Sequence, residues 1–327
     1  MRWSSLGLLK LLVVCAVCAA QLEARAQADD YPNRPIRFVA PIPAGGSTDV
    51  LTRDIARRLQ ERWGQPAVVE NKPGGTGSIG AALVARAPAD GYTLLLVNSG
   101  HVINGHVYAK LPYDPIKDFV PVVHATSLAM GLFVHPSVPA KSLSEFLALA
   151  RAKPGSLSFA SSGNGGAGHL GGELIKSATG IDMVHVPYRG SAPAIADAVA
   201  GQVPVSIADV PLAAPHVRSG ALRPLALASS RRSAVLPDLA TFAEQGIANV
   251  DFSVWVGFLA PAGTPKAIVD KLNREIVAII GEPAMRARLL ELGFEVVAGS
   301  PAEFEQTMKA DHDRFGAVVR KVGIKLE

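Results

Sequence analysis

The fold class is set by the stretch IRFVAPIPAGGSTDV, which occupies residues 36–50. Residues 36–40 are mostly apolar and predict a β-strand, and residues 41–46 form a turn rich in proline and glycine. Residues 49–63 place their apolar side chains on one helical face, and Gly64 marks the end of that helix. A strand, a glycine turn and a helix in this order predict one unit of an α/β protein.

The same unit recurs in two groups along the chain, which predicts two doubly wound α/β lobes built on parallel sheets. The strand at residues 92–97 is a continuous apolar run, as is typical of a parallel sheet covered on both faces. Capping boxes at Ser142 and Ser300 predict two further helix starts. The other predicted strands are residues 67–70, 157–160, 183–186, 203–208 and 225–228, and the other predicted helices are residues 81–87, 168–179, 192–200 and 264–281.

Two long extended segments predict where the chain passes between the lobes. Residues 119–135 are long for one strand, and residues 251–260 form a second extended apolar segment. Two crossings of this kind predict a hinged pair of lobes with a ligand cleft between them. The predicted boundaries assign residues 29–126 plus 256–327 to the first lobe and residues 127–255 to the second.

Residues 1–28 have the organisation of a secretory signal peptide. An apolar run covers residues 6–20, and two small-x-small cleavage sites end at Ala26 and Ala28. A membrane anchor is the weaker alternative, because the run is short for a bilayer span and Lys10 interrupts it. We therefore expect export, with cleavage near Ala26 or Ala28.

Composition and charge exclude several classes of protein. Hydrophobic residues make up 49% of the chain and charged residues 18%, which excludes a disordered chain. Both cysteines lie in residues 1–28, so the exported chain has no disulfide, no thiol nucleophile and no Cys-ligated metal. Residues 1–28 also hold three basic side chains against one acidic, so cleavage lowers the formal charge from +4 to +2. This nearly neutral balance predicts no nucleic-acid partner.

Four glycine- or serine-rich turns between a predicted strand and a predicted helix form the candidate ligand site. In an open α/β sheet such turns lie at the carboxyl ends of the strands, where ligands bind. Helix N-termini there expose free N–H groups and the positive end of the helix dipole, which suit a carboxylate or a phosphate. One such turn is explained more simply as a tight turn, but four of them, spread over both lobes, favour an anion-binding cleft. The turns are residues 43–49, 74–78, 161–169 and 188–191.

The signals for catalysis, cofactors and metals are weaker. Ser162, His169 and Asp209 could form a hydrolase triad, but helix capping by Ser162 and local hydrogen bonding by His169 are simpler explanations. Residues 75–80 and 163–168 match the dinucleotide fingerprint, but neither is followed about 20 residues later by the acidic residue that the fingerprint needs. The sequence has no P-loop, no Gly-x-Ser-x-Gly elbow and no His-Glu-x-x-His motif. We expect no enzyme activity, no cofactor and no metal.

Short motifs spread over nearly the whole exported chain carry a family resemblance. They are Tyr31-Pro32-x-Arg34-Pro35-Ile36-Arg37, Pro43-Ala44-Gly45-Gly46-Ser47-Thr48-Asp49, Glu70-Asn71-Lys72-Pro73-Gly74, Gly77-Ser78-Ile79-Gly80, Asp90-Gly91-Tyr92-Thr93-Leu94, Leu111-Pro112-Tyr113-Asp114-Pro115, Gly163-Asn164-Gly165 with His169, Val186-Pro187-Tyr188-Arg189-Gly190 and Pro215-His216-Val217-Arg218-Ser219-Gly220. In this combination the chain resembles the Bug family, the periplasmic solute-binding receptors of tripartite tricarboxylate transporters.

The resemblance implies a type II periplasmic-binding-protein fold. It implies a small carboxylate ligand, gripped between the lobes largely by main-chain groups and small hydroxyl groups. It also implies a monomeric periplasmic receptor that delivers its ligand to the integral membrane subunits of a transporter. Two alternatives are a ligand-presenting partner of a membrane sensor and a secreted serine hydrolase.

The resemblance also implies which residues bind the ligand. Many relatives have an Asp-Asn pair where the strand ending at Asp209 has Ala-Asp, so Asp209 could accept a hydrogen bond from an amine or hydroxyl group of the ligand. The implied ligand-binding residues are Ala44, Gly45, Gly46, Ser47, Thr48 and Ser99 in the first lobe, and Ser161, Ser162, Gly163, Asn164, His169, Tyr188, Arg189, Gly190, Ser191 and Asp209 in the second.

Overall fold

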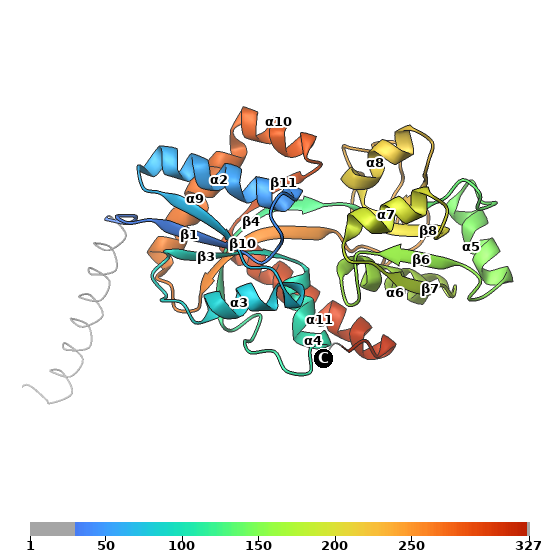
Figure 1. Cartoon of the computed structure of the whole chain (residues 1–327), viewed down its shortest axis with the longest axis horizontal. Helices are drawn as coiled ribbons and strands as arrows, with labels where there is room; N and C mark the ends of the chain where they lie inside the picture. Colours follow the sequence, from blue (N-terminus) through green and yellow to red (C-terminus); the bar gives the residue numbers. More distant parts are fainter. Residues whose placement is uncertain (1–29, 326–327) are drawn as a thin grey trace, which may run out of the picture.

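The computed structural model describes residues 30–325, which form two α/β lobes arranged along the long axis of the molecule (Figure 1). The predicted signal peptide, residues 1–28, lies outside the described residues. Within residues 30–325, no helix combines the length and the hydropathy that a bilayer crossing requires.

Lobe 1 is built on a six-stranded sheet with the order β11-β4-β10-β3-β1-β2. β1 pairs in parallel with β2 and β3, whereas β10 is antiparallel to both β3 and β4. Alternate residues of β1 face opposite ways, so Phe38 packs with the helices α2 and α9 while Val39 packs with α3. The strands are β1 (Ile36–Ala40), β2 (Ala67–Asn71), β3 (Thr93–Asn98), β4 (Phe119–Leu128), β10 (Val254–Pro261) and β11 (Glu295–Gly299), and the helices are α2 (Ser47–Trp63), the short 3₁₀ turn η1 (Gly75–Gly77), α3 (Ser78–Ala85), α4 (Gly100–Val107), α9 (Lys266–Gly281), α10 (Pro283–Glu291) and α11 (Pro301–Val322).

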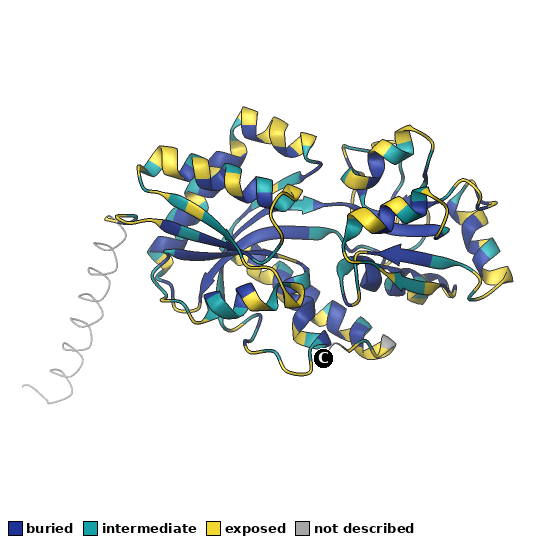
Figure 2. Ribbon diagram, viewed as in Figure 1, coloured by how far each residue is buried: buried dark blue, intermediate teal, exposed yellow. Residues whose placement is uncertain are grey.

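Lobe 2 is built on a five-stranded sheet with the order β7-β6-β8-β5-β9. β6 pairs in parallel with β7 and β8, and β5 is antiparallel to β8 and β9. Figure 2 shows that buried residues gather on the strands of both lobes and exposed residues on the outer faces of the helices. The strands are β5 (Met130–Val134), β6 (Ser158–Ser161), β7 (Val184–Pro187), β8 (Val205–Asp209) and β9 (Arg223–Leu227), and the helices are α5 (Leu143–Ala152), α6 (Ala167–Thr179), α7 (Ser191–Val199) and α8 (Val210–Arg218).

The strand order confirms two doubly wound lobes but corrects the expectation of purely parallel sheets. In each lobe one strand from a crossing segment, β10 or β5, lies antiparallel beside the third parallel strand. The reason is geometric: a chain that arrives from the other lobe enters the sheet from the opposite end. The parallel part of each sheet is therefore limited to three strands, β2-β1-β3 and β7-β6-β8.

The two predicted crossings exist. The segment 119–135 is divided at Ala129, so that β4 belongs to lobe 1 and β5 to lobe 2. The return segment begins with Phe252 in the core of lobe 2 and continues into β10 of lobe 1. Helix α11 adds a link that the sequence did not indicate, because Phe304 packs in the core of lobe 1 and Phe315 in that of lobe 2. The residue boundaries of the lobes remain a prediction.

Candidate functional site

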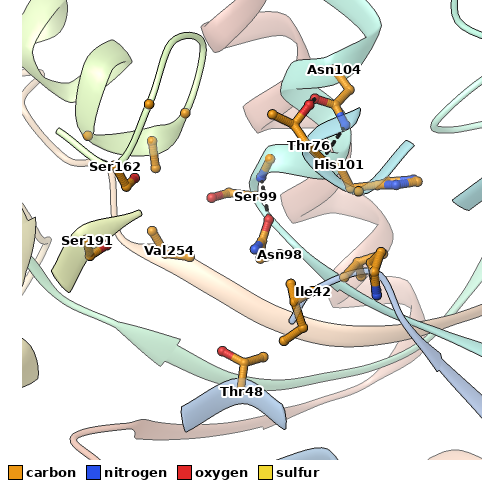
Figure 3. A pocket seen from close by; sticks show the side chains of 18 of the residues that line it. Ile42, Thr48, Thr76, Asn98, Ser99, His101, Asn104, Ser162, Ser191 and Val254 are labelled. Atoms are coloured by element: carbon orange, nitrogen blue, oxygen red, sulfur yellow. Dashed lines mark hydrogen bonds between the residues drawn. The ribbon is translucent and has the colours of Figure 1, made fainter. Parts of the chain in front are cut away.

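A cavity of about 1000 Å³ lies between the lobes, at the carboxyl ends of their parallel strands. Loops that follow β1, β2 and β3 line it from lobe 1, and loops that follow β6 and β7, together with the end of β8, line it from lobe 2. Figure 3 shows Thr48 and Ser99 on one side and Ser162 and Ser191 on the other, with Val254 of the return crossing between them. The arrangement is the one expected for a ligand site in open α/β sheets.

One helix of each lobe starts in the same way at this cavity. Helix α2 begins after Gly46 and α6 begins after Gly166, and both glycines are extended, with ψ near 163° and 169°. Neither helix has a side-chain cap. The glycine before each cap adopts positive φ, +93° at Gly45 and +70° at Gly165. This conformation favours glycine and turns the chain sharply into the helix.

A side chain in the third position of each helix fixes the turn before it. The N–H of Gly45 donates to Asp49 Oδ2 at 3.0 Å, and the N–H of Gly165 donates to His169 Nδ1 at 3.1 Å. These bonds satisfy the N–H group that precedes each helix cap. The first N–H groups of α2 and α6 remain without helical partners, as in any helix, and are available to an anion.

Asp49 is held as a carboxylate by three donors. Arg53 Nε donates to it at 2.9 Å, Asn71 Nδ2 at 2.8 Å, and the Gly45 N–H completes the set. Burial would raise the pKa of this carboxyl, but the hydrogen bonds from Arg53, Gly45 and Asn71 outweigh it and lower the pKa below its usual value. These hydrogen bonds to the loop of lobe 1 therefore persist at neutral pH.

His169 is neutral and lies behind the loop of lobe 2. Its ring stacks on that of His185, with centroids 3.8 Å apart, and His185 Nε2 is 2.7 Å from Ser161 Oγ. Burial, with a smaller contribution from Lys176, lowers the pKa of His169 to about 4. Since Nδ1 accepts the Gly165 N–H, the ring carries its hydrogen on Nε2.

Three other histidines also have a lowered pKa. Burial lowers the pKa of His185 to about 4, with help from His169, and it lowers the pKa of His101 and His124 in lobe 1 to about 4 as well. With His169 they are called the low-pKa histidines below. All four are neutral at pH 7.

Lobe 1 also offers a hydroxyl group and an ordered second loop. Ser99 is 1% exposed, lines the cavity, and its Oγ has no hydrogen-bond partner within residues 30–325. Thr76 is tied to α4 by hydrogen bonds of its Oγ1 to Asn104 Oδ1 (3.1 Å) and Tyr108 Oη (2.8 Å). An unpartnered buried hydroxyl group on a cavity wall is suited to a polar ligand.

The lining carries few charges. Within the described residues, Arg189 and Asp209 are the charged side chains on the cavity wall, and both belong to lobe 2. Asp209 Oδ2 accepts a hydrogen bond from Ser191 Oγ at 3.1 Å. Burial raises the pKa of Asp209 although the Ser191 hydroxyl group opposes the shift. Recognition of an anion here therefore depends mainly on N–H groups, hydroxyl groups and Arg189.

The structure places the sequence-predicted residues in two sets. One set lines the cavity: Ser47, Thr48, Ser99, Ser162, Gly163, Asn164, Arg189, Ser191 and Asp209. The other set lies in or behind the same loops without lining it: Ala44, Gly45, Gly46, Ser161, His169, Tyr188 and Gly190. Tyr188 instead donates to Asp197 Oδ2 at 2.7 Å, within lobe 2.

Several lining residues were not anticipated. Ile42, Asn98, Asn104 and Val254 all line the cavity. Asn104 belongs to α4, a short helix whose glycine, asparagine and histidines gave no helical pattern. The glycine-rich turn 74–78 did point to Thr76, but nothing in the sequence indicated its hydrogen bonds to α4.

Within residues 30–325 the geometry weakens the hydrolase alternative. His169 Nδ1 is occupied by the Gly165 N–H, and Ser162 has no hydrogen bond to either histidine. No group of three or more His, Cys, Asp or Glu residues in this range could hold a metal ion.

The chain is similar in sequence to a known family of receptors. A family model described as tripartite tricarboxylate transporter family receptor matches residues 51–324. Protein BugT of Bordetella pertussis is 36% identical over 326 residues, which cover 98% of this chain and 100% of BugT.

Two solved structures with ligands are also similar. The Rhodopseudomonas palustris protein Rpa4515, solved with adipate, is 38% identical with a TM-score of 0.80, over 90% of this chain and 99% of that one. MatC from the same organism, solved with malate, is 32% identical with a TM-score of 0.76, over 88% and 100%. The family and its structural neighbours, among them the periplasmic binding protein BugD, are solute-binding proteins and not enzymes.

Proposed function

Because the chain belongs to the tripartite tricarboxylate transporter receptor family, we propose that it captures a small carboxylate between its lobes and delivers it to the membrane subunits of such a transporter. Receptors of this family bind small carboxylates and work with membrane transporter subunits. The adipate and malate in two neighbours support a carboxylate as the ligand class here.

The observation that carries the proposal is the pair of matching helix starts. Helices α2 and α6 come from different lobes, yet each begins at the cavity with a glycine cap and no side-chain cap. Away from the cavity, α5 and α11 are capped by Ser142 and Ser300, whereas α9 and α10 have no side-chain cap. The property that sets α2 and α6 apart from α9 and α10 is therefore that their uncapped starts lie at the cavity. Helices that leave their first N–H groups uncapped on a cavity wall provide donors and positive dipole ends for an anion.

Closure of the hinge would bring these helix starts together on one ligand. Charge-assisted hydrogen bonds from N–H groups to a carboxylate strengthen as water leaves and the local dielectric falls. Ser99 Oγ, unpartnered in its loop, would add a donor from lobe 1. In this proposal the lining set named above binds the ligand, and Gly45, Gly165, Asp49 and His169 hold the binding loops in place.

Three finer points belong to the same proposal. The receptor acts as a monomer, its lobes follow the boundaries predicted from the sequence, and its signal peptide is cleaved near Ala26 or Ala28. Intact-mass measurement of the protein exported from cells tests the cleavage site, and size-exclusion chromatography with light scattering tests the monomer.

A thermal-shift screen tests the ligand class. The exported chain is melted with dicarboxylates, amino acids and aromatic acids, each paired with its uncharged amide as the matched control. We expect at least one carboxylate to raise the melting temperature while its amide does not, because only the acid carries the charge that the helix starts favour. If no carboxylate stabilises the protein, the proposed ligand class is wrong.

A further inference from the structure

Asp209 occupies an unusual position for a protein that binds anions. It ends β8 and precedes α8, it is half-buried, and it lines the cavity in lobe 2. Its Oδ2 accepts the hydroxyl hydrogen of Ser191, and no ion pair involves it within the described residues. Oδ1 has no donor from another residue of the described chain. Besides the Ser191 hydroxyl group, the carboxyl group interacts only with its own backbone N–H, and no cation of the described chain neutralises it.

The surroundings of Asp209 make an open acceptor costly. Met130 lies opposite it in the pairing of β5 with β8, and Met130 and Ile207 are apolar residues of the same cavity wall. Burial raises the pKa of its carboxyl group. A carboxylate has no hydrogen to donate, so once closure removes water from the cavity its further hydrogen bond would come from a donor on the ligand.

Arg189 does not supply that donor. It is exposed, lines the cavity beside Gly190 and Ser191, and makes no ion pair with Asp209. Both residues belong to lobe 2, so hinge closure does not by itself bring them together. The wall thus presents one unpaired cation and one unpaired anion to the same ligand.

We infer that the ligand carries a hydrogen-bond donor, a hydroxyl or an ammonium group, that binds Asp209 while its carboxylate binds the helix starts. This inference rests on the proposed function and narrows its ligand class to hydroxy acids and amino acids. A plain dicarboxylate whose second carboxylate reached Asp209 would meet repulsion between like charges. Asp209 is therefore a specificity-determining residue.

Isothermal titration calorimetry at pH 7.5 with matched ligands tests the inference. Succinate, malate and aspartate differ only in the hydrogen, hydroxyl or ammonium group at one carbon, and the glutarate and adipate series extend the comparison to longer chains. We expect the hydroxyl or the ammonium member of one series to bind about 10- to 150-fold more tightly than its plain member, the range typical of hydrogen bonds to a charged group. The better of the two members identifies the donor.

Two variants separate specificity from general binding. Asp209→Asn keeps the shape and adds a donor, so it should abolish the preference and improve binding of the plain acid. Arg189→Gln should weaken every member of a series by a similar factor. Circular dichroism and melting temperature confirm that each variant folds.

The outcomes distinguish this inference from the proposed function. If plain acids bind as tightly as their donor-bearing counterparts, or if Asp209→Asn leaves the preference intact, the role of Asp209 is refuted while the carboxylate receptor stands. If no member of any series binds, the carboxylate receptor fails and this inference fails with it.

Discussion

Replacing Ala167 by proline removes one backbone N–H group from the cavity wall while it leaves helix α6 in place. Ala167 is the first residue of α6 and lines the cavity. Proline suits the first helical position, where the N–H has no helical partner and φ near −65° is already helical. The preceding Gly166, at φ −78° and ψ 169°, has the extended backbone that a residue before proline requires.

The expected loss is confined to binding. A hydrogen bond to a charged group contributes about 1.5–3 kcal/mol, so Ala167→Pro should weaken carboxylate binding by about 10- to 150-fold. The melting temperature without ligand should stay within about 2 °C of the parent, because no helical hydrogen bond is lost. Alanine has no side-chain polar group, so the effect reports on the backbone alone.

Calorimetry of the parent, Ala167→Pro and Ala167→Ser provides the assay. The serine variant retains the N–H group and should bind within a few-fold of the parent. If Ala167→Pro folds normally and binds its carboxylate as tightly as the parent, the N–H groups of α6 do not hold the ligand. A comparable loss in Ala167→Ser would instead assign the effect to the shape of the wall.

Three further predictions concern stability and the spacing of the lobes. Between pH 6.5 and pH 4 the low-pKa histidines bind protons in the unfolded chain but not in the folded one. The free energy of unfolding should therefore fall as the pH falls through this window. Equal urea midpoints at pH 7 and pH 5 would contradict this prediction. Gly293→Ala places a Cβ 2.1 Å from Pro211 Cγ of the other lobe. The control Gly180→Ala has a similar positive φ, and its Cβ has no atom within 4 Å, so it carries the same backbone strain without the clash. Calorimetry should therefore show weaker ligand binding for Gly293→Ala than for Gly180→Ala. Gly171→Ala places a Cβ 2.0 Å from the ring of Phe252 and should cost about 1–3 kcal/mol of stability in denaturant melts, while an unchanged midpoint would refute the packing of α6 on the return crossing.

Much of the architecture could be predicted because its signals are local. The strand at residues 36–40 was placed correctly, since apolar runs ended by glycine and proline leave little choice of element. The segment 119–135 indicated a crossing because it is longer than one strand, and the structure divides it at Ala129. The loops at the cavity were found from their glycines, which the turns need for positive φ.

Elements that depend on distant contacts could not be predicted. Helix α8 carries Pro211 and Pro215, which obscure a helical pattern, although Pro211 suits the first turn. The antiparallel course of β5 and β10 follows from the direction in which the chain enters each sheet, and no local pattern encodes that direction.

Within the site, residue types were easier to predict than their roles. His169 was a candidate for ligand contact as well as for local hydrogen bonding, and its ring accepts the Gly165 N–H behind the loop. The ring also stacks on that of His185, which is 16 residues away in the sequence and gave no local signal for this contact. Asp49 and His169 play the same part, because each accepts the N–H of the glycine before its helix cap. The sequence gave no sign of this, since the two residues differ in type and lie in different lobes.

A structure with the natural ligand tests the central claim most directly. The exported chain would be purified with its bound solute, the solute identified by mass spectrometry, and the complex crystallised. The account predicts a carboxylate whose oxygens lie about 2.9 Å from backbone N–H groups in the first turns of both α2 and α6. A ligand without a carboxylate, or a carboxylate that contacts neither helix start, would contradict it.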